Sequence, residues 1–199
     1  MNTNNTAYFY DEALIPRTFT VCGIEMKPFC LGHLILLERI KSPVLASDVT
    51  EVSIQQGLTD FFTALTICAL TYEEGLQVLK DDEYSKKVMD VMIKAISNNM
   101  EAESKEWNIY HKTNMFKLYM TYFMEMPSYS VEQKNSHKTG LDWKIGIWQV
   151  FKKMGYSETD ILNMNMRRLF YEWCQWGESE GGIKVMNSES LKPAEILIL

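Results

Sequence analysis

The chain has 199 residues, of which 46% are hydrophobic and 23% are charged, and its formal net charge is −6. This length and apolar content suit one globular domain with room for an appendage. The acidic balance argues against nucleic acid as the main partner, because neutralising phosphates needs a basic surface. No apolar run reaches the roughly 18 residues of a membrane span, and the opening MNTNNTAYFYDE lacks the pattern of a secretion signal. We therefore expect no nucleic-acid partner and no membrane partner.

The residue types that usually carry chemistry are scattered along the chain. No CxxC pair occurs among the four cysteines, so we expect reduced, buried thiols at Cys22, Cys30, Cys68 and Cys174. The three histidines, at positions 33, 111 and 137, are too widely spaced for a common metal site. Phosphate-binding loops and zinc-protease motifs are missing from the sequence. The sequence therefore favours a protein that is not an enzyme, with no catalytic residue, no metal and no cofactor.

The first predicted elements are a hairpin and a helix. Residues 18–28 alternate with a period of two around Gly23, which predicts a small β-hairpin. Leu31 to Lys41 carries leucines at helical spacing and predicts a helix. Ser42-Pro43 ends this helix, because the residue before a proline disfavours helical angles.

Two helix starts follow the first helix. The patterns SIQQ at 53–56 and TYEE at 71–74 match the capping box, in which a hydroxyl and an acid or amide satisfy the free amides of a first turn. They predict one helix that ends near Leu70 and a shorter helix that ends near Lys80.

The segment from Asp81 to Met126 is predicted to be helical with one interruption. Its apolar stripe weakens at Asn98-Asn99 and along the acidic residues up to Glu103, so we predict a break or bend there. The later part, MFKLYMTYFMEM at 115–126, is apolar nearly all round, which is typical of a buried helix. It is either the central core helix, which we favour, or in part an oligomer or partner surface.

Two C-terminal helices are rich in aromatic residues. In the helix predicted for 142–154, Trp143 and Ile147 face inward, whereas Trp148 faces the lysines. A capping pair at Ser157 and Asp160 opens a short apolar step before the next helix.

The last helix is predicted to begin after Asn163 or Asn165 and to end at the glycines 181 and 182. Its inward stripe follows helical spacing and consists of Met166, Leu169, Phe170, Trp173 and Cys174. Tyr171 lies among Arg167 and Arg168, and Trp176 lies on the flank. Tyr171 is either an amphipathic surface residue, which we favour, or part of an aromatic partner site.

The predicted fold is mostly α, a bundle of about six to seven helices with a small N-terminal β-hairpin. Residues 1–126 form the hairpin and a helical core, and 127–139 form a polar linker or loop. Residues 140–186 form a C-terminal helical unit packed on the core, followed by the tail 187–199, which ends in ILIL. An apolar segment of this kind usually docks on its own domain or on a partner.

Two stretches resemble bacteriophage tail assembly chaperones. The first is FTVCGIEMKPFCLGHLILLERIKSP at 19–43, in which LGHLILLE is the most specific piece. The second is 140–182, with GYS at 155–157, the DIL step at 160–162, the aromatic helix and the Glu-Gly stop. The two stretches together make up about one third of the chain.

The resemblance implies a non-enzymatic role in the host cytoplasm. Such chaperones coat the apolar helices of the tape-measure protein while the tail tube polymerises. The implied partner is a tape-measure or tail-tube protein, bound by one copy or by a homo-oligomer. The competing class is a permanent virion component, such as a head–tail connector or a baseplate protein. We hypothesise that the partner contacts are made by Trp148, Tyr171, Trp176, Phe116, Met120 and Phe123.

Overall fold

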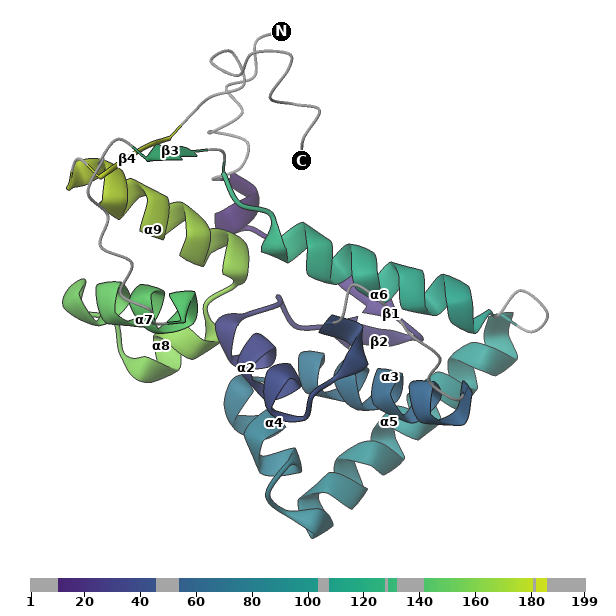
Figure 1. Cartoon of the computed structure of the whole chain (residues 1–199). Coiled ribbons are helices and arrows are strands. Elements are labelled where there is room, and N and C mark those ends of the chain that lie inside the picture. The colour runs from purple at the N-terminus through teal and green to yellow at the C-terminus, as the bar shows by residue number, and fades with distance from the viewer. Residues whose placement is uncertain are drawn as a thin grey trace, which may run out of the picture. The chain divides into compact units, whose positions relative to one another are not determined.

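The computed structural model describes residues 11–45, 54–103, 108–127, 129–131, 142–180 and 182–185 (Figure 1). Over these residues the chain is mostly helical with an N-terminal two-stranded hairpin, which confirms the predicted fold class. The chain divides into two compact units. The hairpin unit is Thr18–Phe123, and the split unit combines Met1–Arg17 with Met124–Leu199.

The hairpin consists of β1 (Phe19–Val21) and β2 (Ile24–Met26), which pair antiparallel. Its two turn residues both have positive φ, 52° at Cys22 and 75° at Gly23. Two positive φ angles make the mirror-image turn whose twist matches that of the strands. Glycine is needed at 23 for a second reason, because a Cβ there would lie 2.9 Å from the Cβ of Asn99.

Helices make up the rest of the hairpin unit: α2 (Leu31–Arg39), η1 (Pro43–Leu45), α3 (Ile54–Cys68), α4 (Tyr72–Val78), α5 (Asp82–Glu103) and α6 (Ile109–Met124), whose last residue belongs to the split unit. The predicted box at the start of α4 is present, since Glu74 N–H donates to Thr71 Oγ1 and Thr71 N–H donates to the Glu74 carboxylate. The predicted box at 53–56 starts outside the described residues. Helices α2, α3 and α4 contact one another, and both α3 and α4 contact α5.

The core of the hairpin unit is aromatic and centres on Tyr119 of α6. The ring centroid of Tyr119 lies 5.5–5.9 Å from four other rings, those of Phe19, Phe29, Phe116 and Phe123. Its hydroxyl donates to the backbone oxygen of Lys27 at 2.8 Å, so the buried polar atom is satisfied. The other face of α6 is open, since Leu118 is 66% exposed. Helix α6 therefore supplies a core face, as favoured, without being buried all round.

The segment from Asp81 to Met126 is divided into two helices, as predicted, but the interruption follows Glu103 and does not fall at Asn98-Asn99. Helix α5 continues through Asn98 and Asn99 to Glu103. The Asn99 side-chain amide donates to the Glu103 carboxylate one turn further on at 3.0 Å, and the Asn99 Cβ backs the hairpin turn at Gly23. A long-range contact and an i,i+4 hydrogen bond thus support a residue with weak helix propensity.

The split unit contains a helical turn at 11–14 and the elements β3 (Tyr129–Val131), α7 (Trp143–Lys153), α8 (Glu158–Asn163), α9 (Met166–Ser179) and β4 (Ile183–Val185). Helix α8 opens with the predicted Ser157–Asp160 box. Strands β3 and β4 pair antiparallel with Tyr129 opposite Val185, and α9 contacts β4 (Figure 1). The sequence predicts no such pair, because residues 127–139 are polar, show no periodicity and are predicted as a linker or loop. Most of the predicted linker, at 128 and 132–139, and the tail 187–199 lie outside the described residues.

Candidate functional site

Helices α7 and α9 contact each other and present their apolar faces to one site. Each begins at a side-chain cap, with Asp142 Oδ1 accepting from Lys144 N–H and Asn165 Oδ1 accepting from Arg168 N–H. The caps fix where the helices start and hence which residues share a face. The predicted inward residues Trp143 and Ile147 of α7 meet Phe170 and Trp173 of α9 there.

These side chains line an apolar pocket with a volume of about 380 Å³. The described lining consists of Met124, Met126, Tyr129, Trp143, Ile147, Phe170 and Trp173. Ile147 and Phe170 are buried and form its floor, whereas Met126, Tyr129 and Trp143 are exposed and form its rim. Sites for drug-sized ligands range over roughly 300–1,000 Å³. At about 380 Å³ this pocket has room for a small apolar ligand or for one or two apolar side chains.

Aromatic contacts hold the rim in place. The rings of Tyr129 and Trp173 meet edge to face at 5.5 Å, and those of Trp143 and Phe170 lie 6.0 Å apart. Lys144 Nζ lies 5.3 Å from the centre of the Trp143 ring and 2.8 Å from Asp142 Oδ2. The hydrogen bond from Lys144 holds the pKa of Asp142 below its usual value, so this carboxylate is charged at neutral pH and keeps the ammonium near the ring.

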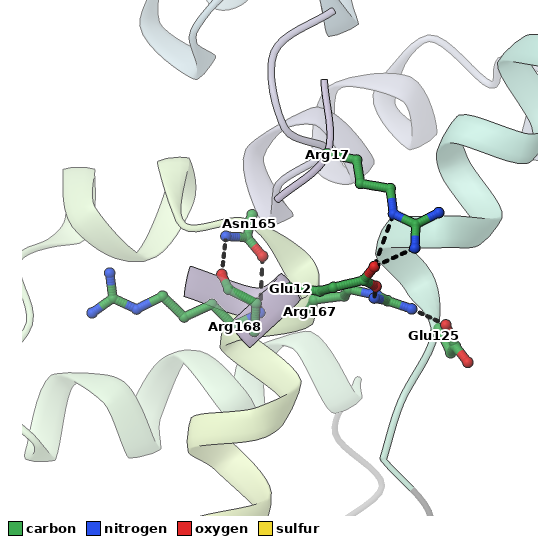
Figure 2. A network of polar contacts seen from close by, with 7 residues as sticks. Glu12, Arg17, Glu125, Asn165, Arg167 and Arg168 are labelled. Atoms are coloured by element: carbon green, nitrogen blue, oxygen red, sulfur yellow. Dashed lines mark hydrogen bonds and ion pairs between the residues drawn. The ribbon is translucent and has the colours of Figure 1, made fainter. Parts of the chain in front are cut away.

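A buried arginine fixes the segment that carries both pocket methionines. Arg167 of α9 is 3% exposed and pairs with Glu12 and with Glu125 (Figure 2). Glu125 stands between Met124 and Met126, so its ion pair holds these two side chains near the start of α9. The arginine therefore positions part of the pocket wall.

The N-terminal segment of the split unit is fixed at the same place. The Asn165 amide that caps α9 also donates through Nδ2 to the backbone oxygen of Ala13 at 2.8 Å. Arg17 Nε donates to the Glu12 carboxylate at 2.8 Å, so that one carboxylate lies between two cations (Figure 2). Residues 11–17 are thereby bound to the first turn of α9.

Three of the six hypothesised contact residues lie in the core of the hairpin unit. Phe116, Met120 and Phe123 are buried on the inner face of α6. A partner could touch them only if that core opened.

The other three lie in the split unit and outside the described pocket lining. Trp148 is half-buried, with Lys152 Nζ 5.8 Å from its ring centre, and Trp176 is also half-buried. Tyr171 is only 9% exposed, packs against Ala13, and accepts a hydrogen bond from Gln175. The favoured interpretation of Tyr171 as a surface residue is wrong, because the N-terminal segment covers that face of α9.

None of the seven described pocket residues is among the six hypothesised contact residues. Met124 is the last residue of α6 and Met126 lies two positions further on, both within the segment 115–126 that is predicted as a core helix or in part a partner surface. Tyr129 lies in a stretch with no periodicity, so no local pattern marks it. The two helices that form the rest of the pocket, α7 and α9, do carry a sequence signal. Trp143 and Trp173 both fall on inward stripes, and two bulky rings on facing helices leave gaps that other side chains must fill.

The described thiols and the one buried histidine are held in their neutral forms. Burial raises the pKa of Cys22 to about 11 and the pKa values of Cys30 and Cys174 to about 12. Burial lowers the pKa of His33 to about 4. Among the described residues, no group of three or more His, Cys, Asp or Glu side chains is placed to hold a metal ion. Within the same ranges, every helix is too short or too polar to cross a membrane.

Comparison with known proteins gives no relative: no family model, no curated protein and no solved structure matches this chain.

Proposed function

We propose that this chain is a non-enzymatic binding protein that shields apolar helices of a tape-measure protein during phage tail assembly. The proposal joins the resemblance of 19–43 and 140–182 to tail assembly chaperones with one observation, the apolar pocket between α7 and α9. The proposed site of action is the host cytoplasm, where tails are assembled.

The composition of the pocket suits a partner that offers apolar side chains in series. An amphipathic helix binds a groove through anchors at i, i+3 or i+4 and i+7. A cavity of about 380 Å³ suits one or two such anchors. The tryptophans at 143 and 173 are the residue type most often found at the energetic centre of interfaces. The methionines at 124 and 126 are unbranched and flexible, so they adapt to different anchors along one long helix.

Photo-crosslinking from the pocket rim tests the proposal. A photoreactive amino acid is placed at Met126, which is 38% exposed and lines the pocket. The matched control carries it at Met154, which is 39% exposed and lies at the end of α7 outside the described lining. The protein is co-expressed with the tape-measure, tube and baseplate proteins of the same phage. We expect the tape-measure protein to cross-link from 126 and not from 154.

The other outcomes are equally informative. Cross-linking of a connector, tube or baseplate protein from 126, together with the chain in purified particles, would favour the virion-component alternative. Equal cross-linking from 126 and 154 would mean that the pocket is not the binding site.

A further inference from the structure

Helix α5 carries more apolar surface than its own unit covers. It has 22 residues, all of them described, and Ile96 alone is buried. Asn99, three positions further on, lies against the hairpin turn, so these two residues mark the side of the helix that faces the core. Val91, Ile93 and Met100 lie elsewhere on the helix and are 65%, 54% and 44% exposed.

A stripe along one flank of α5, which we call the α5 seam, has the spacing of a coiled coil. Its members follow one another at alternating steps of four and three residues. They are Tyr84, Val88, Val91, Ala95, Asn98 and Ala102. The first two and Ala95 are half-buried, and the other three are exposed. The α5 seam lies about 120° around the helix from Ile96, away from the core side.

We propose that the α5 seam pairs with the same seam of a second copy of this chain, with the two helices antiparallel. Both copies then contribute the same surface, and the twofold axis passes level with residue 93, midway between Tyr84 and Ala102. The pairing uses no residue of the described pocket lining, so it is independent of the function proposed above.

The order of large and small residues along the α5 seam favours the antiparallel orientation. The first half carries a tyrosine and two valines, whereas the second half carries two alanines and an asparagine. In the antiparallel pair Tyr84 lies opposite Ala102 of the second copy, Val91 lies opposite Ala95, and the remaining valine lies opposite the asparagine. Larger side chains then face smaller ones along the whole contact. A parallel pair would set Tyr84 against its own copy at one end and leave a gap at the other.

Charges beside the α5 seam favour the same register. The exposed Lys87 lies opposite the exposed Glu101 of the second copy, and twofold symmetry gives this pair twice. Lys87 also pairs with Glu83 of its own helix at 2.8 Å, and its ammonium has three donors, so it can bind both carboxylates. Lys94 meets its own copy near the axis, where Asp90, one turn earlier on each helix, reduces the repulsion. A parallel pair would instead place like charges together at both 87 and 101.

The contact is small, so the dimer should be weak and reversible. At about 1.5 Å per residue α5 is about 33 Å long, and a strip about 10 Å wide along it covers roughly 330 Å² on each copy. Standard interfaces bury about 800 Å² on each partner. The asparagine in the seam lowers the affinity further. We expect a dissociation constant of about 100 μM.

Sedimentation velocity of the full-length protein, from about 10 μM to about 1 mM, tests the pairing. The test variant is Val91→Lys. The matched control is Ile93→Lys, which places the same charge on the opposite flank of α5. Both residues are more than half exposed, so neither change disturbs the fold. We expect the unchanged chain and the control to dimerise as the concentration rises, and the dissociation constant of the test variant to increase at least about tenfold.

A charge exchange tests the orientation. Lys87→Glu and Glu101→Lys should each weaken the dimer about threefold to tenfold, because each places like charges opposite one another twice. The double variant, and an equal mixture of the two single variants, should regain the affinity of the unchanged chain. The control is Lys86→Glu, which makes the same change of charge on the side of α5 away from the seam and should have no effect.

A monomer at every concentration would overturn the pairing, as would equal weakening by the substitutions at Val91 and Ile93. In a parallel pair Lys87→Glu and Glu101→Lys would leave the affinity unchanged, since like charges already face one another there. That result, or a double variant as weak as the single variants, would contradict the antiparallel register.

Discussion

Arg167 is a buried cation held between two unequal carboxylates (Figure 2). The side chain of Glu12 is 12% exposed, whereas that of Glu125 is 60% exposed. The pair with Glu12 is poorly screened by water and carries most of the interaction, because exposed pairs contribute little. The exposed ion pair between Glu125 and Arg167 contributes little energy, and its main effect is to hold Met124 and Met126 in position.

Replacing Arg167 with Ala should lower the free energy of unfolding of the split unit by about 3 kcal/mol, because Glu12 keeps a buried charge and loses its buried partner. Urea unfolding followed by circular dichroism at pH 7 measures the change.

The control for this substitution is Arg17→Ala, which removes the other cation from the same carboxylate. Arg17 is 60% exposed, so its loss should cost less than about 1 kcal/mol. Equal losses for the two variants would mean that burial of Arg167 does not determine its contribution.

His33 makes the hairpin unit sensitive to acid. Its Nδ1 accepts from the backbone N–H of Cys30 at 3.3 Å, and its Nε2 lies 2.7 Å from the backbone oxygen of Leu70. Both nitrogens are thus used by the neutral ring with its proton on Nε2. Burial lowers the pKa from 6.5 to about 4, so the unfolded chain binds a proton between these values that the folded chain does not.

Stability should therefore be complete above pH 6.5 and should fall by roughly 3 kcal/mol as the pH is lowered to 4. His33→Gln keeps one donor and one acceptor without titrating. The difference between the unfolding free energies of the two proteins, measured from pH 4 to pH 7.5, isolates the histidine from the carboxylates. A constant difference over this range would contradict the prediction.

At the scale of elements, Asn165 joins the start of α9 to the N-terminal segment. Its oxygen caps the helix, and its nitrogen donates to the backbone oxygen of Ala13. Asn165→Ala loses both interactions and should cost about 2 kcal/mol. Asn165→Ser keeps a capping oxygen and should cost about 1 kcal/mol. Thermal unfolding of the two variants measures both costs. Equal costs would show that the capping oxygen contributes nothing, and a Ser variant as stable as the unchanged protein would show that the bond to Ala13 contributes nothing.

Local signals in the sequence identify most of the elements. The turn at Gly23 and the boxes at Thr71 and Ser157 each act within four residues, so they can be read without knowledge of the fold. Local signals do not predict that Asn99 lies within a continuous helix, because its role in α5 depends on a turn that lies 76 positions earlier in the sequence.

The pocket could be predicted only in part, because its wall comes from segments far apart in the sequence. The stripes of α7 and α9 predict Ile147 and Phe170 as inward residues, and both are buried. Trp143, also predicted to face inward, is 45% exposed on the pocket rim. Tyr129 lines the pocket because β3 pairs with β4. In the same way, Tyr171 is buried because the helical turn at 11–14 packs against it. Non-local contacts of these kinds leave no periodic pattern in either partner.

At the scale of the whole molecule, the two units should unfold separately. Structures that divide into compact units commonly open unit by unit, with different free energies. Arg167→Ala should speed amide exchange in α9 about 100-fold, which corresponds to a loss of about 3 kcal/mol. Amides of α3 should exchange at an unchanged rate. Hydrogen exchange followed by mass spectrometry reads both, and equal acceleration in α3 and α9 would show a single cooperative transition.

The split unit also has a consequence for biosynthesis. Glu12 and Arg167 are 155 positions apart, and the whole of Thr18–Phe123 lies between them. At about 5–20 residues per second, the ribosome releases Arg167 roughly 8–30 s after Glu12. The hairpin unit is complete before the first segment of the split unit can meet α9. The order of translation therefore sets an order of assembly, in which the pocket closes around Met124 and Met126 only when the last helix has been made.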